Sequence, residues 1–286
     1  MPIQPPRVEG HLVQRVSDIV RGVAASVVMP SFRSLRPEDV QAKQTPGDPE
    51  DLVTIVDHAA ERRLIEQLDG LVPDAAFVGE EAACAQPAVL DALARAAPAW
   101  LIDPIDGTKN FANGNANFGV MVALVENGVA RASWMAVPAA LPRGYIVVAQ
   151  QGIGTSVDGR RIDRRDVPDP PRGSVHTRMA PPATARALGR ALEGKYRSVP
   201  STGSAATEYS AILHGDKDFV IYYRLLPWDH APGALAVTEA GGAAMHLSGR
   251  PYTPLSLNQV TIFAASPDLA ETIRAWLADM IVPTGG

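Results

Sequence analysis

Residues 100–111 read WLIDPIDGTKNF, an apolar run that ends among aspartates, and this stretch sets the tightest limit on the fold. The pattern predicts a buried strand over residues 99–108, with Asp103 and Asp106 three positions apart near its end. Carboxylates rarely crowd together unless a cation or a shared proton relieves their repulsion. The rest of the chain must therefore supply that relief at the end of this strand.

The composition excludes several classes of protein. The 286 residues are 46% hydrophobic, which is enough for one large core or two moderate ones. Because 31 acidic side chains outnumber 26 basic ones, we expect no broad basic surface and no nucleic-acid partner. Cys84 is the only cysteine, so an intrachain disulfide and a zinc site built from several thiolates are excluded.

The sequence also lacks the patterns of export and of membrane insertion. The start MPIQPPRVEGHL does not have the charged and then apolar layout of a signal peptide. The longest clean apolar run, GVMVALV at residues 119–125, is far shorter than the roughly 20 residues of a membrane-spanning helix. We therefore expect a cytoplasmic protein with no membrane partner.

Hydrophobic periodicity predicts alternating helices and strands with hairpins among them, and hence mixed or antiparallel sheets. The proline-rich stretch 166–173 marks a boundary between an N-terminal half, residues 1–167, and a C-terminal half, residues 168–286. Helices are predicted over 9–30, 54–68, 182–193, 201–215, 228–242 and 268–281. Strands are predicted over 75–81, 99–108, 144–150, 173–177, 196–199, 217–224 and 260–266, with a hairpin over 118–138 and an Asp-Gly turn within 154–162.

Acids end predicted elements in three separate segments: Glu80 with Glu81, Asp103 with Asp106, and Asp229. Oxygen ligands without paired Cys or His suit a hard cation such as Mg²⁺ or Mn²⁺. Two such ions can clamp the attacking and leaving oxygens of a phosphoryl transfer. A helix that begins at Gly107 would present backbone N–H groups to an anion, and Thr108 would hold a water if a carboxylate partnered it.

Each segment also has a plain structural interpretation. Asp103 and Asp106 can belong to a turn after a strand, the two glutamates can be solvated, and Asp229 can cap a helix. The order and spacing of all three segments in one chain favour a shared site.

The chain resembles the inositol monophosphatase family of metal-dependent phosphomonoesterases. The resemblance rests on DLVTIVD (51–57), GEE (79–81), DPIDGTKNF (103–111), GSAA (203–206) and WDHAPGALAVTEAGG (228–242), in the family's order and spacing. It implies an α+β fold, a layered α-β-α-β-α sandwich. It also implies Mg²⁺ dependence, lithium sensitivity and a homodimer.

The resemblance also implies roles for individual residues. Glu80, Asp103 and the carbonyl of Ile105 would hold a first ion, Asp103, Asp106 and Asp229 a second, and Glu80 with waters a weaker third. Thr108, with Asp57 as its partner, would activate the attacking water beside Glu80, and Gly107 and Thr108 would receive the phosphate. The predicted substrate contacts are Ile105, Asp106, Gly107, Thr108, Gly203, Ser204, Ala205, Tyr222, Arg224 and Asp229.

Departures from the family pattern bear on the substrate. Animal inositol phosphatases carry a glutamate that binds the inositol hydroxyls, and Tyr222 stands at that position here. Arg224 nearby could pair with a second phosphate or a carboxylate on the substrate, or simply with a surface acid. Nucleotidases of the family usually carry a glutamate where this chain has Asn110.

The predicted function is therefore a Mg²⁺-dependent phosphomonoesterase that acts on a small polyol or sugar phosphate, such as inositol 1-phosphate, through metal-activated water. The alternatives within the family are a histidinol-phosphate phosphatase, a fructose-1,6-bisphosphatase or a 3′-phosphoadenosine nucleotidase. A protein that binds metal and phosphate without catalysis is the alternative from another class.

Overall fold

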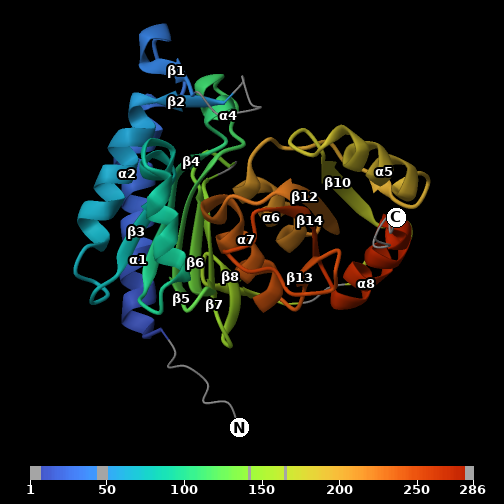
Figure 1. The fold of residues 1–286 in the computed structure, drawn as a ribbon. Coiled ribbons are helices and arrows are strands. Elements are labelled where there is room, and N and C mark those ends of the chain that lie inside the picture. The colour runs from blue at the N-terminus through green and yellow to red at the C-terminus, as the bar shows by residue number, and fades with distance from the viewer. Residues whose placement is uncertain (1–7, 44–50, 141–142, 164–165, 281–286) are drawn as a thin grey trace.

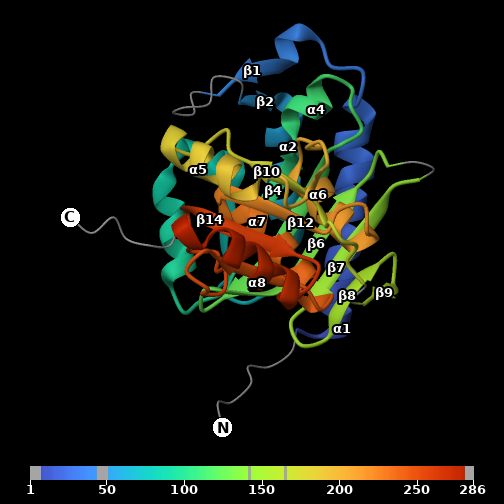
Figure 2. The ribbon, with the colours of Figure 1, turned by 90° about the vertical axis from the view of Figure 1, so that its right-hand side faces the viewer.

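Five layers of helix and sheet follow one another across the molecule, as Figure 1 shows from left to right. The computed structural model describes residues 8–43, 51–140, 143–163 and 166–280. Helices α1 (Gly10–Val23) and α2 (Ile55–Leu68) cover a seven-stranded sheet, and α6 (Ala205–His214) and α7 (Pro227–Glu239) separate it from a five-stranded sheet. Helices α5 (Pro182–Leu192) and α8 (Pro267–Trp276) cover the far face, which is turned toward the viewer in Figure 2. The predicted layered α+β fold is confirmed.

The first sheet comes from the N-terminal part of the chain. Its order is β3-β4-β5-β6-β7-β8-β9, with β3 and β4 parallel and every later pair antiparallel. The β5–β6 hairpin turns at Asn127 and Gly128, which both have positive φ, as the most favoured two-residue turn requires. The strands are β3 (Ala76–Gly79), β4 (Ala99–Asp106), β5 (Gly119–Glu126), β6 (Val129–Val137), β7 (Tyr145–Gln150), β8 (Gly154–Val157) and β9 (Arg160–Ile162).

The second sheet comes from the C-terminal part of the chain. Its order is β11-β10-β12-β14-β13, parallel across the first three strands and antiparallel beyond them. The strands are β10 (Arg172–His176), β11 (Arg197–Ser198), β12 (Phe219–Arg224), β13 (Ala243–His246) and β14 (Asn258–Ala264). The two sheets thus use different parts of the chain, while the division at residue 167 into two halves stays a prediction.

Smaller elements gather near one end of the first sheet. A two-stranded ribbon of β1 (Val40–Ala42) and β2 (Leu52–Thr54) lies beside α4 (Thr108–Ala112), and the short helix α3 (Glu80–Ala85) follows β3. The 3-10 segments are Met29–Ser31, Pro37–Asp39, Pro87–Ala94 and Ala278–Met280. The β1–β2 ribbon, α3 and α4 lie near the ends of β3 and β4, where the predicted acids lie, whereas Ala278–Met280 packs beside α8.

The observed elements differ from the predicted ones mainly at their ends. The predicted helix 9–30 is α-helical only to Val23, and a π-helical turn, Ala24–Val28, and a 3-10 turn continue it toward Pro30. Pro30 has no N–H to donate and its ring crowds the preceding turn, so a regular α-helix does not continue through it. The strand predicted from residue 217 begins at Phe219, because Lys217 and Asp218 are buried in polar contacts before it.

Candidate active site

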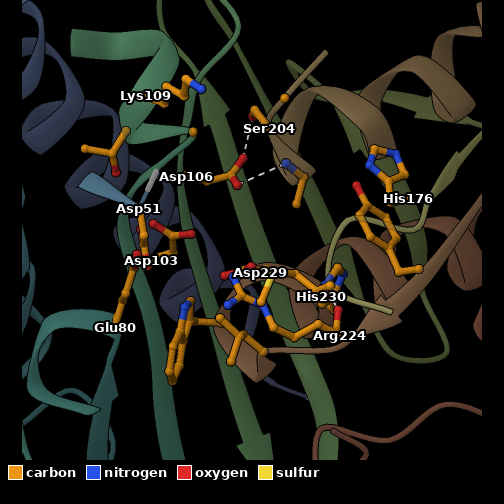
Figure 3. Close-up of a pocket in the computed structure, with 18 of the residues that line it drawn as sticks. Asp51, Glu80, Asp103, Asp106, Lys109, His176, Ser204, Arg224, Asp229 and His230 are labelled. Carbon is orange, nitrogen blue, oxygen red and sulfur yellow. Dashed lines mark hydrogen bonds between the residues drawn. The ribbon is translucent and has the colours of Figure 1, made fainter. Parts of the chain in front are cut away.

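A cavity of about 800 Å³ opens where β4, β10 and β12 end and where α3, α4, α6 and α7 begin. It contains every predicted site residue except Asp57, which lies fully buried behind Thr108. Figure 3 shows the acids Glu80, Asp103, Asp106 and Asp229 around this cavity. The residues that line it include Glu80, Asp103, Ile105, Asp106, Gly107, Thr108, Gly203, Ser204, Ala205, Tyr222, Arg224 and Asp229.

A bulge at the end of β4 brings Asp103 and Asp106 into this cavity together. Asp103 pairs with Met121 and Asp106 with Gly119, so three steps on β4 match two on β5. In a regular strand, residues three apart point to opposite faces, and the extra residue cancels that alternation. Pro104 lies inside the bulge, where a residue without an N–H interrupts no regular ladder.

The N-terminus of α6 holds Asp106. Its carboxylate accepts hydrogen bonds from the Ser204 hydroxyl, from Ala205 N at 3.0 Å and from Ala206 N at 2.7 Å. Burial raises the pKa of Asp106, and these donors oppose the rise, which leaves the pKa at about 6. Gly107 next to it has φ +83°, and a Cβ there would stand 2.9 Å from Ser204 Cβ, so only glycine allows β4 and α6 to approach this closely.

Asp103 carries the strongest sign of an incomplete charge balance. Its side chain is buried, and its Oδ1 has no hydrogen-bond partner among the described residues. Burial, followed by the charges of Glu80, Asp106 and Asp229, raises its pKa well above the ordinary value. Burial and the neighbouring acids likewise raise the pKa of Asp229. A cation at this point would relieve all of these repulsions at once.

The donors fit a hard divalent cation, although they are not gathered around one point. Within the described ranges, no three His, Cys, Asp or Glu side chains are grouped closely enough to hold one ion. The acids have other partners instead, since Lys43 binds Glu80 and the α6 amides bind Asp106. The oxygen-only chemistry matches Mg²⁺ or Mn²⁺, and an ion would compete with Lys43 for Glu80.

Lys43, at the end of the β1–β2 ribbon, was not predicted from the sequence. Its Nζ lies 2.6 Å from Glu80 Oε1 and 2.7 Å from Glu81 Oε1. Burial acts to lower the pKa of Lys43, but the two glutamates raise it overall. Burial and Glu80 in turn raise the pKa of Glu81 to about 8. Lys43 lies in a segment without periodicity, so nothing in the local pattern points to this contact.

Glu61 is a second residue that the sequence analysis missed. It is buried on α2, one turn beyond Asp57, and it accepts hydrogen bonds from Glu81 N at 2.9 Å and Ala82 N at 3.0 Å. These are amides at the start of α3, so Glu61 fixes the helix that carries Glu80. The spacing Asp57-x-x-x-Glu61, which places two acids on one helix face, was the available signal.

Asp57 and Thr108 meet as predicted. Thr108 Oγ1 lies 3.0 Å from Asp57 Oδ1 and 2.9 Å from the Ile105 carbonyl oxygen. Thr54 donates its N–H at 2.8 Å and its hydroxyl at 2.6 Å to the other oxygen of Asp57. Burial raises the pKa of Asp57 to about 6 against these hydrogen bonds. The Thr108 hydroxyl therefore faces two acceptors, and its own lone pairs remain available to accept a hydrogen bond from a water.

The opposite side of the cavity is aromatic and basic. His176 stacks on Tyr222 with ring centroids 4.2 Å apart, and the ring centroids of Tyr222 and His230 are 4.5 Å apart. Arg178 and Arg224 also line this side. His176 and Arg178 were not singled out in the sequence, because the strand pattern at β10 gives no indication of what lies opposite it.

Comparisons with known proteins agree with this geometry. A model of the inositol monophosphatase family matches residues 13–280. An inositol-1-monophosphatase of Mycobacterium leprae is 34% identical over 83% of this chain and 81% of its own. A fructose-1,6-bisphosphatase/inositol-1-monophosphatase of Thermotoga maritima is 31% identical over 73% of this chain and 76% of its own.

Solved structures show the same architecture. The structure of an inositol monophosphatase from Thermotoga maritima superimposes with a TM-score of 0.74 at 25% identity, covering 96% of this chain and 100% of that one. In the described residues, no helix has both the length and the apolar character to cross a membrane. The matched family model, the relatives and the site geometry agree, and the chain belongs to the inositol monophosphatase family, whose members are metal-dependent hydrolases of phosphomonoesters.

Proposed function

We propose that this chain is a Mg²⁺-dependent phosphatase that hydrolyses a small polyol or sugar phosphate in the cavity described above. The observation that carries the proposal is the buried Asp103, with one oxygen unpartnered among the described residues and a raised pKa, at the centre of the acids. A buried carboxylate with a raised pKa is typical of a functional site, and a bound cation with its phosphate would balance its charge.

The proposed ion-binding residues are those that the family resemblance indicates. Glu80, Asp103 and the Ile105 carbonyl would hold one ion and Asp103, Asp106 and Asp229 another, with a third near Glu80 and with Mn²⁺ as an alternative. When bound, such ions neutralise phosphate charge and lower the pKa of a coordinated water. In this proposal the Thr108 N–H at the start of α4 and the neighbouring Gly107 N–H would receive the phosphate oxygens.

The Thr108–Asp57 pair orients the attacking water in this proposal. A hydroxyl has one proton, and both neighbours of Thr108 Oγ1 in the structure are acceptors, Asp57 and the Ile105 carbonyl. Thr108 therefore directs its proton toward these acceptors, and its oxygen would accept a hydrogen bond from the water. Asp57, held in place by Thr54, would accept the proton that the water releases through Thr108.

The relatives support two of the substrate alternatives. One curated relative is named a fructose-1,6-bisphosphatase/inositol-1-monophosphatase and others inositol-1-monophosphatase, so we propose inositol 1-phosphate and fructose 1,6-bisphosphate as the two substrates to test first. Histidinol phosphate and 3′-phosphoadenosine 5′-phosphate remain alternatives from the same family. Lithium sensitivity, a homodimer and a cytoplasmic location remain predictions that rest on the resemblance and on the sequence.

Phosphate release from these four substrates, with Mg²⁺ and with EDTA, tests the proposal. We expect Mg²⁺-dependent release, and we expect Asp103→Asn to abolish it, since the neutral amide removes the shared charge of the ion site. Asp91→Asn, an equivalent change at an exposed position outside the cavity, is the control and should retain activity. Unchanged turnover in Asp103→Asn would contradict the metal site. Binding of Mg²⁺ and phosphate without release would favour a non-catalytic protein.

A further inference from the structure

The residues that line the cavity divide by charge into two sides. The acids that line it, Asp51, Glu80, Asp103, Asp106 and Asp229, lie together with Lys109 on the side that includes the proposed ion-binding residues. The other side, which we call the basic wall, is formed by residues 175–179 and 222–224. Among these described residues the basic wall has two arginines, one histidine and no acid. Figure 3 shows His176 of this wall across the cavity from Asp51, Asp103 and Glu80.

An irregularity in β12 exposes the basic wall to the cavity. The register with β14 shifts between Tyr222 and Arg224, from partner Thr261 to partner Asn258. Because a regular strand alternates its faces, three consecutive residues do not normally line one cavity, yet Tyr222, Tyr223 and Arg224 all do. The irregularity therefore turns Arg224 toward the substrate side.

A buried histidine fixes the backbone of Arg224. This residue is His230 on α7, whose side chain is buried. Its Nε2 lies 3.0 Å from the Arg224 carbonyl, which only accepts, so Nε2 carries the proton. Nδ1 then accepts from the Tyr209 hydroxyl at 2.7 Å. Helices α6 and α7 thus both hold the end of β12, and the base of the Arg224 side chain has little freedom.

Asp229 is the acid closest to Arg224 in the sequence and lines the same cavity, but no ion pair joins the two among the described residues. No ion pair joins Arg224 to an acid in the part of the chain that the structure describes. The guanidinium is therefore available to an anion that enters the cavity.

Resting on the proposed phosphatase function, we infer that the preferred substrate carries a second anionic group, a carboxylate or a phosphate, on its leaving group, and that Arg224 binds this group with Arg178 beside it. A guanidinium pairs with such planar or tetrahedral oxyanions through two hydrogen bonds. The residues of the basic wall include no carboxylate that could accept hydrogen bonds from a neutral polyol. Tyr222, at the position of the family's glutamate, is stacked against His176. The selectivity therefore comes from charge.

Two pairs of matched esters test this inference. Each pair differs only in the second group: 3-phosphoglycerate against glycerol 3-phosphate for a carboxylate, and fructose 1,6-bisphosphate against fructose 1-phosphate for a phosphate. We expect kcat/KM to be about tenfold or more higher for the anionic member of at least one pair, as expected for a charged hydrogen bond. Arg224→Gln should bring that ratio close to one, and Arg224→Lys should retain part of it.

The controls separate the possible failures. Arg160→Gln, at an exposed position outside the cavity, should leave the ratio as in the wild type, and melting temperatures check that each variant folds. A wild-type ratio near one in both pairs overturns the inference. The inference is also overturned if Arg224→Gln lowers kcat/KM equally for both members of a pair, because Arg224 would then act on Asp229 and not on the second anionic group.

If the enzyme releases no phosphate from any ester, the proposed function fails. The inference is still tested in that case by the ratio of the dissociation constants within each pair, measured by calorimetry with the wild type and Arg224→Gln. A ratio near one in binding overturns it, and a ratio that Arg224→Gln removes supports it.

Discussion

At the residue scale, the site depends on carboxylates that are buried more deeply than charge normally allows. Asp57 is fully buried and Asp103 nearly so, yet each has a specific environment: Asp57 accepts from Thr54 and Thr108, and Asp103 faces other acids. The first arrangement stabilises a carboxylate that orients its neighbour. In the second arrangement the acids repel one another, and a cation at this point would relieve that repulsion. The two buried acids therefore have different environments.

Replacing Thr108 tests the role of the first arrangement. Thr108→Ala should lower kcat about a hundredfold or more with little change in KM, because the water loses its acceptor while the phosphate contacts remain. Thr108→Ser keeps the hydroxyl and should retain most of the activity. Steady-state kinetics of the three proteins decides this. A Thr108→Ala variant that changes KM alone would show that Thr108 only binds substrate.

At the element scale, helix ends position the acids. The N-termini of α6 and α3 each meet a buried carboxylate, Asp106 in the first case and Glu61 in the second. The contact with Glu61 also explains why residue 79, just before α3, is a glycine. A Cβ at Gly79 would lie 2.4 Å from the Glu61 carboxyl carbon. The orientation of Glu80 thus depends on a residue that never reaches the cavity.

Removing Glu61 should weaken metal activation more than chemistry. Glu61→Ala frees the first turn of α3, so the Mg²⁺ concentration for half-maximal activity should rise about tenfold, with a smaller effect on kcat at saturating Mg²⁺. Glu61→Gln keeps a carbonyl acceptor, so its Mg²⁺ requirement should lie between those of the wild type and Glu61→Ala. Glu66→Ala, on the exposed face of the same helix, is the control. Equal Mg²⁺ requirements in wild type and Glu61→Ala would refute this positioning role.

A buried ion pair under the second sheet links stability to pH. Glu208 accepts hydrogen bonds from Lys217, Ser174 and Thr202 N. Burial acts to raise its pKa, but His176, Lys217 and Thr202 lower it to about 2. Since the unfolded state binds this proton near pH 4.5, Glu208 stabilises the fold above that pH. This contribution is lost as the pH falls toward 2.

Urea unfolding of Glu208→Gln measures this contribution. The variant should lose about 3–5 kcal/mol at pH 7, because the buried ammonium group of Lys217 loses the negative charge of Glu208. The difference from wild type should shrink between about pH 5 and pH 2. Removing both charges in Glu208→Gln/Lys217→Met should restore part of the stability. A difference that does not depend on pH would assign the loss to packing instead.

At the scale of the whole molecule, α7 joins the two sheets. Nearly all residues of α7 are buried, and the hydrophobic cluster around them includes Met135 of the first sheet and Phe263 of the second. Gly233 lies against Tyr209 of α6 so closely that a Cβ would meet the ring at 1.9 Å. The halves predicted from the sequence therefore share one central layer, and we expect them to unfold together.

Gly233→Ala should lower stability by about 3 kcal/mol or more, since the overpacked methyl group must push α6 and α7 apart. Gly189→Ala, on exposed α5 with no atom within 4 Å of the new Cβ, should instead be neutral or slightly stabilising. Calorimetry of both variants and the wild type provides the comparison. Two separate transitions in the wild type would show that the halves fold independently.

The sequence by itself determined which residues are candidates for the site and most of the local structure around them. The acids of WLIDPIDGTKNF, the helix start near Thr54, the hairpin at Asn127-Gly128 and the helix end at Gly215 are local patterns that depend on neighbours a few residues away. The family resemblance rests on the same short segments. These features were predictable because propensity, capping and periodicity act over one or two turns of chain.

The tertiary structure alone decided which distant residues meet in the cavity. Lys43 reaches Glu80 across 37 positions and Ser204 reaches Asp106 across 98, and no periodicity records either contact. The bulge that turns Asp103 and Asp106 to one side, and the irregularity that turns Arg224 inward, depend on registers with other strands. Such contacts form only when the layers pack, because burial there is a property of the assembled fold and not of any segment.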